Sequence, residues 1–216
     1  MTRSFGWPDL LFLIEAARWT VLVSLVAFAG GALGGALICI LKLSCGRLGG
    51  AVVRVWVQLG QGIPVLMQLF LFYFGLSILG FEVPPLLAAA VAFGLYASAN
   101  IGVIWLGAVD AIPKQQWEAG ETLGLSWAQQ MRHVIAPQAL RLALAPTVGF
   151  MVQIVKNTSL TSVIGIVELA RAGQVVNNAT YQPFSVFFAI CVIYFIICFP
   201  LSLLSRGLER RLHVAH

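Results

Sequence analysis

Residues 110–137, DAIPKQQWEAGETLGLSWAQQMRHVIAP, are the longest run of this chain that mixes charged residues with glycine and proline. Long apolar segments flank the run on both sides. Gly124 suits the left-handed residue that ends a helix, and Ser126 followed by Gln129 has the spacing of a capping box that begins one. The run is therefore predicted to form two short helices with a turn at Gly124, and Pro137 is expected to open the next segment.

The composition of the whole chain indicates a membrane protein. Of its 216 residues, 60% are hydrophobic and only 10% are charged, and the mean hydropathy is +0.93. A soluble domain carries about 25% charged residues. We therefore expect a single multi-pass domain over residues 1–216, with no room for a soluble one, and the net charge of +5 gives no reason to expect nucleic-acid binding.

Five apolar runs are each near the roughly 20 residues that cross a bilayer. They cover residues 19–41, 55–81, 86–109, 138–155 and 184–205. Between them we expect an amphipathic lead-in, a basic connector and an irregular stretch, over residues 1–18, 42–54 and 156–183. In the first run, two overlapping GxxxG pairs permit close helix packing, and they are formed by Gly30, Gly31, Gly34 and Gly35.

The basic residues predict the orientation of these spans. Nine of them fall on one side of the membrane: Lys42, Arg47, Arg54, Lys114, Arg132, Arg141, Arg206, Arg210 and Arg211. Four fall on the other side: Arg3, Arg18, Lys156 and Arg171. Because cytoplasmic loops carry the excess of Lys and Arg, the run at 110–137 and the C-terminus are expected in the cytoplasm and the N-terminus outside.

From spacing alone, the run at 110–137 is equally compatible with an ordinary cytoplasmic loop. However, Glu118-Ala119-Gly120, Gly124 and Val134-Ile135-Ala136-Pro137 resemble the EAA loop of ABC importer permeases, written E-A-A, three residues, G, nine residues, I-x-L-P. Gly120, Val134 and Ala136 depart from that pattern. The resemblance implies a coupling helix that docks on a separate ATPase, which binds ATP and Mg²⁺. It makes Glu118, Ala119, Gly120, Gly124 and Pro137 the coupling candidates.

Two further segments narrow the resemblance to the polar amino acid uptake branch. Gly62-Ile63-Pro64 with Gln68 and Tyr73-Phe74-Gly75 is similar to that branch's R-G-T-P…Q…Y-F-G segment. Lys156-Asn157-Thr158-Ser159-Leu160 with Val163-Ile164-Gly165 is similar to its K-[DN]-T-S-L…V-I-G segment. The likeness runs over about residues 19–211.

This branch implies an all-α, five-helix type I importer permease (MetI-like) in the bacterial inner membrane. Its implied partners are an ATP-binding subunit dimer, a second permease copy or a related permease chain, and an extracytoplasmic solute-binding protein.

A polar solute crossing the membrane needs hydrogen-bond partners, since unpaired polar groups in hydrocarbon cost several kcal/mol. Polar residues on the spans and at the end of the fourth span are the candidates for this path: Gln61, Gln68, Asn100, Lys156, Asn157, Thr158 and Ser159. Two other interpretations stay open. The glutamines can serve helix–helix hydrogen bonding, and Lys156 can extend to the outer interface.

The chain departs from the amino acid branch at charged positions. Gln61 stands where that branch usually has Arg, and Asn100, Val103 and Leu106 stand where its Y-x-A-E-x-x-R motif has Tyr, Glu and Arg. Intramembrane charges are costly and usually serve function. We hypothesise that this subunit contributes less to recognition, or that its solute is less charged. Alternatively, the lost charges were helix-packing ion pairs.

An enzymatic function is not expected. The chain has no glycine-rich phosphate loop with Lys-Ser/Thr, and its histidines lack Cys or carboxylate partners at metal-ligand spacing. No cofactor is predicted in this chain. The remaining alternatives are a self-contained channel or secondary transporter that needs no ATPase, and a membrane anchor that does not transport.

Overall fold

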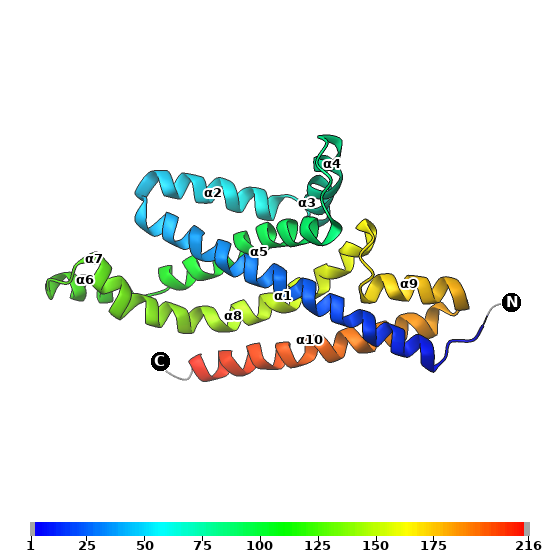
Figure 1. Ribbon diagram of the computed structural model, residues 1–216. Coiled ribbons are helices and arrows are strands. Elements are labelled where there is room, and N and C mark those ends of the chain that lie inside the picture. Colours follow the sequence, from blue (N-terminus) through cyan, green and yellow to red (C-terminus); the bar gives the residue numbers. More distant parts are fainter. Residues whose placement is uncertain (1–2, 214–216) are drawn as a thin grey trace.

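The computed structural model describes residues 3–213, and all regular structure within them is helical (Figure 1). In chain order the elements are α1 (Trp7–Ser44), α2 (Gly46–Gly62), α3 (Val65–Phe70), η1 (Leu71–Gly75), α4 (Leu76–Ile78), α5 (Pro85–Asp110), α6 (Lys114–Thr122), α7 (Trp127–Gln130), η2 (Met131–Ile135), α8 (Ala136–Asn157), η3 (Thr158–Ile164), α9 (Leu169–Thr180) and α10 (Pro183–His213). The segments η1 and η2 are π-helical, and η3 is a 3₁₀ helix.

Four continuous helices in the described part are long and apolar enough to cross a membrane. They run over Trp7–Ser44, Pro85–Asp110, Trp127–Ile164 and Pro183–Arg211. A fifth span results if the pair Gly46–Gly62 and Val65–Ile78, which bends by 99°, is counted as one. The predicted all-α membrane architecture is thus confirmed.

The glycines of α1 allow it to pack closely along α5. A Cβ atom on Gly31 would overlap the side chain of Ala97 and lie 3.1 Å from its backbone carbon. A Cβ on Gly35 would lie 2.9 Å from Ile101. This contact lies beside the main core, which includes Val23, Ala27, Leu69, Phe93 and Ile101. The predicted role of the GxxxG pairs in helix packing is confirmed for this helix pair.

Two predictions at the ends of the first span are wrong. Residues 7–18 are not a separate lead-in, because α1 is continuous from Trp7 and buries Leu13 and Ala16 against α9 and α10. Residues 42–54 are not a connector. Lys42 lies in the last turn of α1, which ends at Ser44. Only Cys45 separates the two helices, and α2 begins at Gly46. The basic charges at residues 42–54 suggested a connector, but helix propensity and packing make most of these residues helical.

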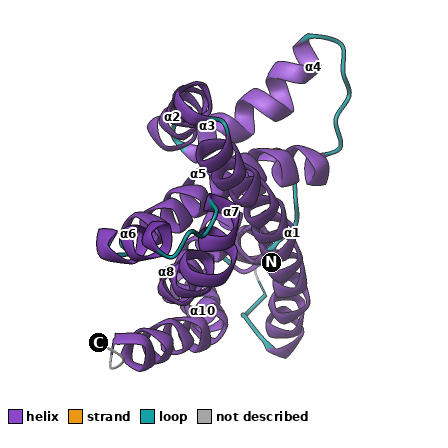
Figure 2. Ribbon diagram, turned by 90° about the vertical axis from the view of Figure 1, so that its left-hand side faces the viewer, coloured by secondary structure: helices purple, strands orange, loops and turns teal. Residues whose placement is uncertain are grey.

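The second predicted span, residues 55–81, is not one continuous helix. The chain bends at Ile63–Pro64, where Pro64 has no N–H to continue the ladder. The side-chain amide of Gln68 donates to the carbonyl oxygens of Gly60 and Ile63, at 3.0 and 2.9 Å. The two carbonyl groups at the bend therefore have a hydrogen-bond donor within the chain. Beyond α3, which packs on the core through Leu69, α4 projects away from the other helices (Figure 2).

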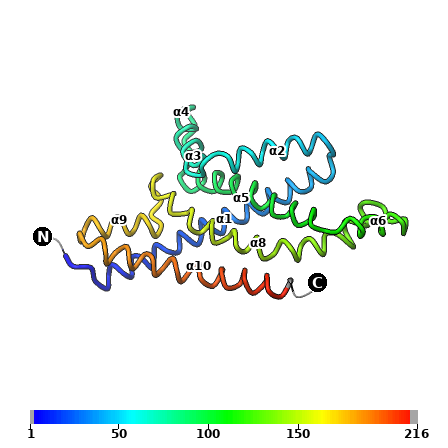
Figure 3. The backbone as a smooth tube through the Cα atoms, turned by 180° about the vertical axis from the view of Figure 1, so that it is seen from behind, coloured from blue at the N-terminus to red at the C-terminus, as the bar shows by residue number. Residues whose placement is uncertain are grey.

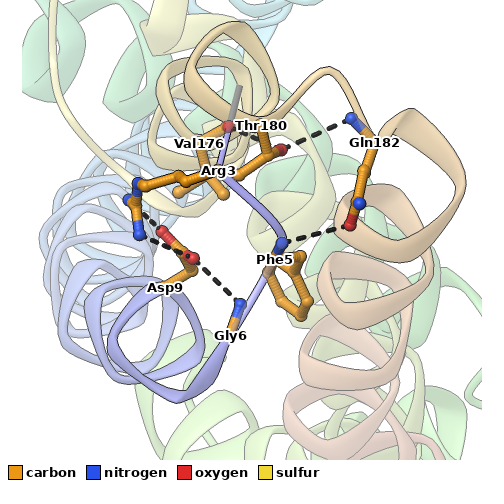
Figure 4. Close-up of polar contacts among 7 residues, drawn as sticks. All are labelled: Arg3, Phe5, Gly6, Asp9, Val176, Thr180 and Gln182. Atoms are coloured by element: carbon orange, nitrogen blue, oxygen red, sulfur yellow. Dashed lines mark hydrogen bonds and ion pairs between the residues drawn. The ribbon is translucent and has the colours of Figure 1, made fainter. Parts of the chain in front are cut away.

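The stretch 156–183, predicted to be irregular, contains the regular helix α9. Gly173 lets this helix approach α10 closely, because a Cβ there would overlap Ile190. The N-terminal residues also fold onto this region (Figure 4): the N–H of Phe5 donates to Gln182 Oε1 at 3.1 Å, and Asp9 accepts from Gly6 N at 3.0 Å while pairing with Arg3.

The helices lie roughly side by side, and their connections gather at two ends (Figures 1 and 3). One end holds the α1–α2 turn, α6, α7 and the end of α10, whereas the other end holds the start of α1 and α9. This separation places the basic α1–α2 turn on the same end as the run at 110–137.

We predict that Gly31→Ala destabilises the fold and that Gly30→Ala does not. The added methyl at position 31 overlaps Ala97, whereas at position 30 it lies 3.6 Å from Gly94 Cα, an ordinary contact. Overpacking costs about 1–3 kcal/mol, so the unfolding temperature in detergent, followed by fluorescence, should fall for Gly31→Ala alone. Equal unfolding temperatures for the two variants would contradict the close α1–α5 contact.

Candidate functional site

The turn between α6 and α7 has the predicted left-handed glycine. Gly124 has φ +71°. Its N–H donates to Glu121 O at 2.9 Å, and the N–H of Leu125 donates to Gly120 O at 3.0 Å, which is the Schellman pattern. Ser126 and Gln129 then form the predicted capping box that starts α7. The α6–α7 hairpin, residues 114–130, is thus specified by local sequence.

Gly120 sets the spacing of the two helices in this hairpin. The side chain of Gln130 is buried against it, and a Cβ at position 120 would lie 2.9 Å from Gln130 Cγ. Gln130 also donates to Leu125 O at 3.2 Å. Gly120 departs from the E-A-A pattern because the Gln130 side chain occupies the space that an alanine methyl would need.

The outer surface of the hairpin offers both charge and apolar area. Glu118 and Ala119 are exposed, and Leu123 and Trp127 are 78% and 49% exposed. Trp117, in contrast, packs inward with Met131 on a cluster of residues from α5 and α8. Such a surface fits docking of another protein.

The hairpin continues into a helix long and apolar enough to span a membrane. Residues 127–164 form one continuous apolar helix that includes α7, η2 and α8. Pro137 lies at the second position of α8 and has no N–H to donate. The N–H of Ala136 donates to Met131 O, five residues back, so the helix passes the proline through a π turn. Helix α7 therefore continues into α8 without a loop between them.

Two pairs of side-chain amides lie on an open side of the helices. Gln61 Nε2 donates to Asn100 Oδ1 at 3.2 Å, and Asn100 Nδ2 donates to Tyr96 O at 2.8 Å. On α8, Gln153 Nε2 donates to Asn157 Oδ1 at 3.3 Å. We call Gln61, Asn100, Gln153 and Asn157 the amide face.

Aromatic rings connect the two halves of the amide face. The rings of Tyr96 on α5 and Phe150 on α8 lie 5.8 Å apart. Tyr96 lies one helical turn before Asn100, and Phe150 lies almost one turn before Gln153. Within residues 3–213, the Nδ2 atom of Asn157 is buried and has no hydrogen-bond partner.

The other predicted path residues lie in different surroundings. Gln68 is buried at the α2–α3 bend, where it bonds two carbonyls. Thr158 is buried and donates to Val155 O, and Ser159 donates to Lys156 O, both at 2.8 Å. Lys156 is exposed. The structure therefore brings Gln61 and Asn100 together and places Asn157 beside Gln153, while Gln68 and Thr158 serve the backbone.

Val103 and Leu106 follow Asn100 along α5, and both are partly or fully accessible. Val103 is 41% exposed and lies one turn beyond Asn100, on the same side of the helix. An uncharged surface thus continues from the amide face toward the α6–α7 hairpin.

Glu168 is a structural centre that the sequence analysis did not select. Its side chain is fully buried and caps α9, accepting from the N–H groups of Ala170 and Arg171 at 2.9 Å each. Its Oε2 also accepts from Tyr194 at 3.1 Å and from Thr20 at 3.4 Å. One carboxyl thereby ties α1, α9 and α10 together. An acidic residue just before an amphipathic segment was the available signal.

Burial raises the pKa of the Glu168 carboxyl above its ordinary value of 4.5, although the N–H groups of Ala170 and Arg171 and the hydroxyls of Tyr194 and Thr20 oppose the shift. In the described part of the chain no cation pairs with this carboxyl. The group is therefore held by hydrogen bonds alone.

Comparison with known proteins gives consistent matches. The family described as "Binding-protein-dependent transport system inner membrane component" matches residues 31–214. The glutamine transport system permease protein GlnP of Escherichia coli K12 is 35% identical over 210 residues, covering 96% of each chain. The probable amino-acid ABC transporter permease protein YckA of Bacillus subtilis is 30% identical, covering 93% of this chain and 88% of that protein.

Solved structures agree with these sequence matches. An amino acid ABC transporter crystallised with histidines superposes with a TM-score of 0.89 at 28% identity, covering 97% of this chain and 100% of the other. The inward-facing MetNI methionine ABC transporter gives a TM-score of 0.74 at 19% identity, covering 96% and 99%. The second match concerns the fold alone, and it confirms the predicted type I importer permease architecture.

We predict that Glu168→Ala lowers the free energy of unfolding by about 2–4 kcal/mol, because a helix cap is lost and buried hydroxyl and N–H groups are left without an acceptor. Glu168→Gln keeps one acceptor oxygen for one of the two N–H groups and an NH2 group that can donate to a hydroxyl, so it should cost less than Glu168→Ala. Unfolding in detergent at neutral pH measures both.

The raised pKa also predicts a pH dependence. Above pH 4.5 the unfolded carboxyl loses its proton before the folded one, so stability should fall as pH rises through this window. This slope should disappear in Glu168→Gln, and an unchanged slope would exclude Glu168 as its source.

Proposed function

Because the chain belongs to the binding-protein-dependent transport system inner membrane components, among the permeases of amino acid ABC importers, we propose that it forms half of a path for an uncharged polar amino acid of the glutamine type. It is a multi-pass inner-membrane permease subunit, and ATP hydrolysis belongs to a separate subunit. The alternative of a channel or carrier without an ATPase is not favoured by this family.

The observation that supports the mechanism most is the continuous helix from the α6–α7 hairpin to the amide face. Glu118, Ala119, Leu123 and Trp127 are presented outward for an ATPase, and α7 continues into the helix that carries Gln153 and Asn157. Closure of an ATPase dimer around Mg²⁺ and ATP would draw the hairpin, and α8 would move the amide face with it. The positive-inside distribution of Lys and Arg supports a cytoplasmic position for the hairpin.

The amide face supports the class of solute. The carbonyl oxygen of Gln61 and the second N–H of Asn100 remain available after their mutual hydrogen bond. A glutamine side chain offers one amide acceptor and two amide donors, which match these groups. Val103 and Leu106 add no charge to the surface, which favours an uncharged solute. The relatives with glutamine in their names are consistent with this assignment.

The amide face is open in the single chain, and it needs a second permease, either another copy or a related chain, to enclose the solute. At the opposite end, α9 exposes Arg171, Gln174 and Asn178. This polar helix face fits the docking of an extracytoplasmic solute-binding protein, and Glu168 holds it in place.

We predict that the chain purified in mild detergent together with its neighbouring gene products retains an ATPase, and that Glu118→Ala plus Gly124→Pro abolishes this. Proline cannot adopt the φ of +71° at position 124. The matched control is Glu121→Ala, which removes an exposed charge from the end of the same hairpin. Mass spectrometry identifies the co-eluting chains. Recovery of the wild-type chain alone, with ATP-independent transport in liposomes, would overturn the coupling role.

We also predict that Gln61→Leu lowers ATP-driven glutamine uptake in liposomes about five-fold, the factor for one lost hydrogen bond of about 1 kcal/mol. Gln58→Leu is the control, since Gln58 lies on the same exposed helix but makes no bond to Asn100. Uptake of arginine should be tested in parallel. Preferential uptake of arginine by the wild-type complex would contradict the uncharged solute without affecting the ATPase coupling.

A further inference from the structure

A groove of about 510 Å³ lies between α1, α2 and α5, on the opposite side of α5 from Asn100. Its walls are almost entirely apolar because the helices meet there through small residues on α1 and α5, and α2 supplies the third wall. Residues that define it include Gly34, Leu37, Leu41, Val52, Trp56 and Val91. The polar N–H of Trp56 already has a hydrogen-bond partner, because Nε1–H donates to Ser98 Oγ at 3.1 Å.

The length of the groove corresponds to one leaflet of a bilayer. Along α1 it runs from Gly30 to Leu41, which spans about 16 Å at 1.5 Å per residue. The hydrocarbon core of a bilayer is about 30 Å thick. A single acyl chain therefore fits from the membrane centre to the end of the groove.

The end of the groove at Leu41 is basic. Lys42 follows directly and folds over the start of α2, where its Nζ lies 3.1 Å from the position of a Cβ on Gly50. Arg47 is exposed on the first turn of α2. Residues 19–81 contain no Asp or Glu, so these charges have no acidic neighbour in sequence within α2 or within the part of α1 that lines the groove.

We propose that this groove binds one anionic phospholipid, with an acyl chain against Leu37, Val52 and Trp56 and the phosphate at Lys42 and Arg47. In a bilayer an unfilled apolar groove forfeits dispersion contacts along its walls, and a lipid chain restores them. The selectivity for an anionic headgroup comes from the two basic residues. This site requires only that the chain spans a membrane, and it is independent of the proposed solute.

The test reconstitutes the full chain in vesicles of phosphatidylethanolamine containing one fifth phosphatidylglycerol. The chain is then extracted in mild detergent, and the retained lipids are quantified by mass spectrometry. The wild-type chain should retain phosphatidylglycerol above its share of the vesicle. Lys42→Gln plus Arg47→Gln should reduce this enrichment by about five-fold for each charge removed, the factor for about 1 kcal/mol per basic residue at an anionic surface.

Two matched controls separate the site from general effects. Val52→Trp fills the groove and should abolish the retained lipid, whereas Val55→Trp, at a similarly exposed position outside the groove, should leave it unchanged. Arg210→Gln plus Arg211→Gln removes the same charge from the end of α10 and should leave the enrichment intact. Equal lipid retention by the two tryptophan variants would overturn the proposal. A loss of self-association in Val52→Trp but not in Val55→Trp would also overturn it, because it would identify a second copy of the chain as the occupant of the groove.

A second measurement needs no variant that could unfold. Phosphatidylglycerol with brominated acyl chains quenches tryptophan fluorescence on contact, and Trp56 is 38% exposed in the groove. Quenching in the wild-type chain should exceed that in Trp56→Phe at low mole fractions of brominated phosphatidylglycerol, and brominated phosphatidylethanolamine should not reproduce this difference. Equal quenching by the two lipids would overturn the anionic selectivity.

Discussion

The contact between α1 and α5 is the interaction on which the other arrangements depend. In a bilayer no hydrophobic force drives helices together, so association relies on close packing and hydrogen bonds. Gly31 and Gly35 permit that packing by bringing α1 against Ala97 and Ile101. With α5 held at the centre, its remaining surface is divided between the amide face on one side and the apolar groove on the other.

The amide face lies next to a point, and the α6–α7 hairpin contains one, where the chain interrupts a helix without leaving backbone groups unpaired. At Pro64 the amide of Gln68 satisfies the carbonyls of Gly60 and Ile63, and this bend positions Gln61 against Asn100. At Gly124 the Schellman bonds close α6 and direct the chain into α7. Unpaired backbone groups are costly in a membrane, which makes the hydrogen bonds at Pro64 necessary. At Gly124 the Schellman bonds satisfy the carbonyls at the end of α6.

The two ends of the molecule are held differently, in accordance with their roles. The α6–α7 hairpin is held by local bonds and by a helix that continues into a membrane-spanning segment. The opposite end is tied across the chain, through Glu168 to Thr20 and Tyr194 and through Gln182 to Phe5. This difference supports the proposed arrangement, in which solute is delivered at the α9 end and the ATPase docks at the hairpin end.

Local sequence determined the membrane class, the positions of α5 and α10, the capped α6–α7 hairpin and the glycine contact of α1, since hydropathy, capping and small residues act over a few neighbouring positions. It also indicated Gln61, Asn100 and Asn157 as polar groups in a membrane. Only the tertiary structure decided that Gln68 serves the bend instead, that α9 exists, and that Glu168 joins three helices. The role of Gln68 depends on how the chain bends at Pro64, which brings the carbonyls of Gly60 and Ile63 to its amide. The role of Glu168 depends on Thr20, 148 residues away, and no local pattern encodes that contact.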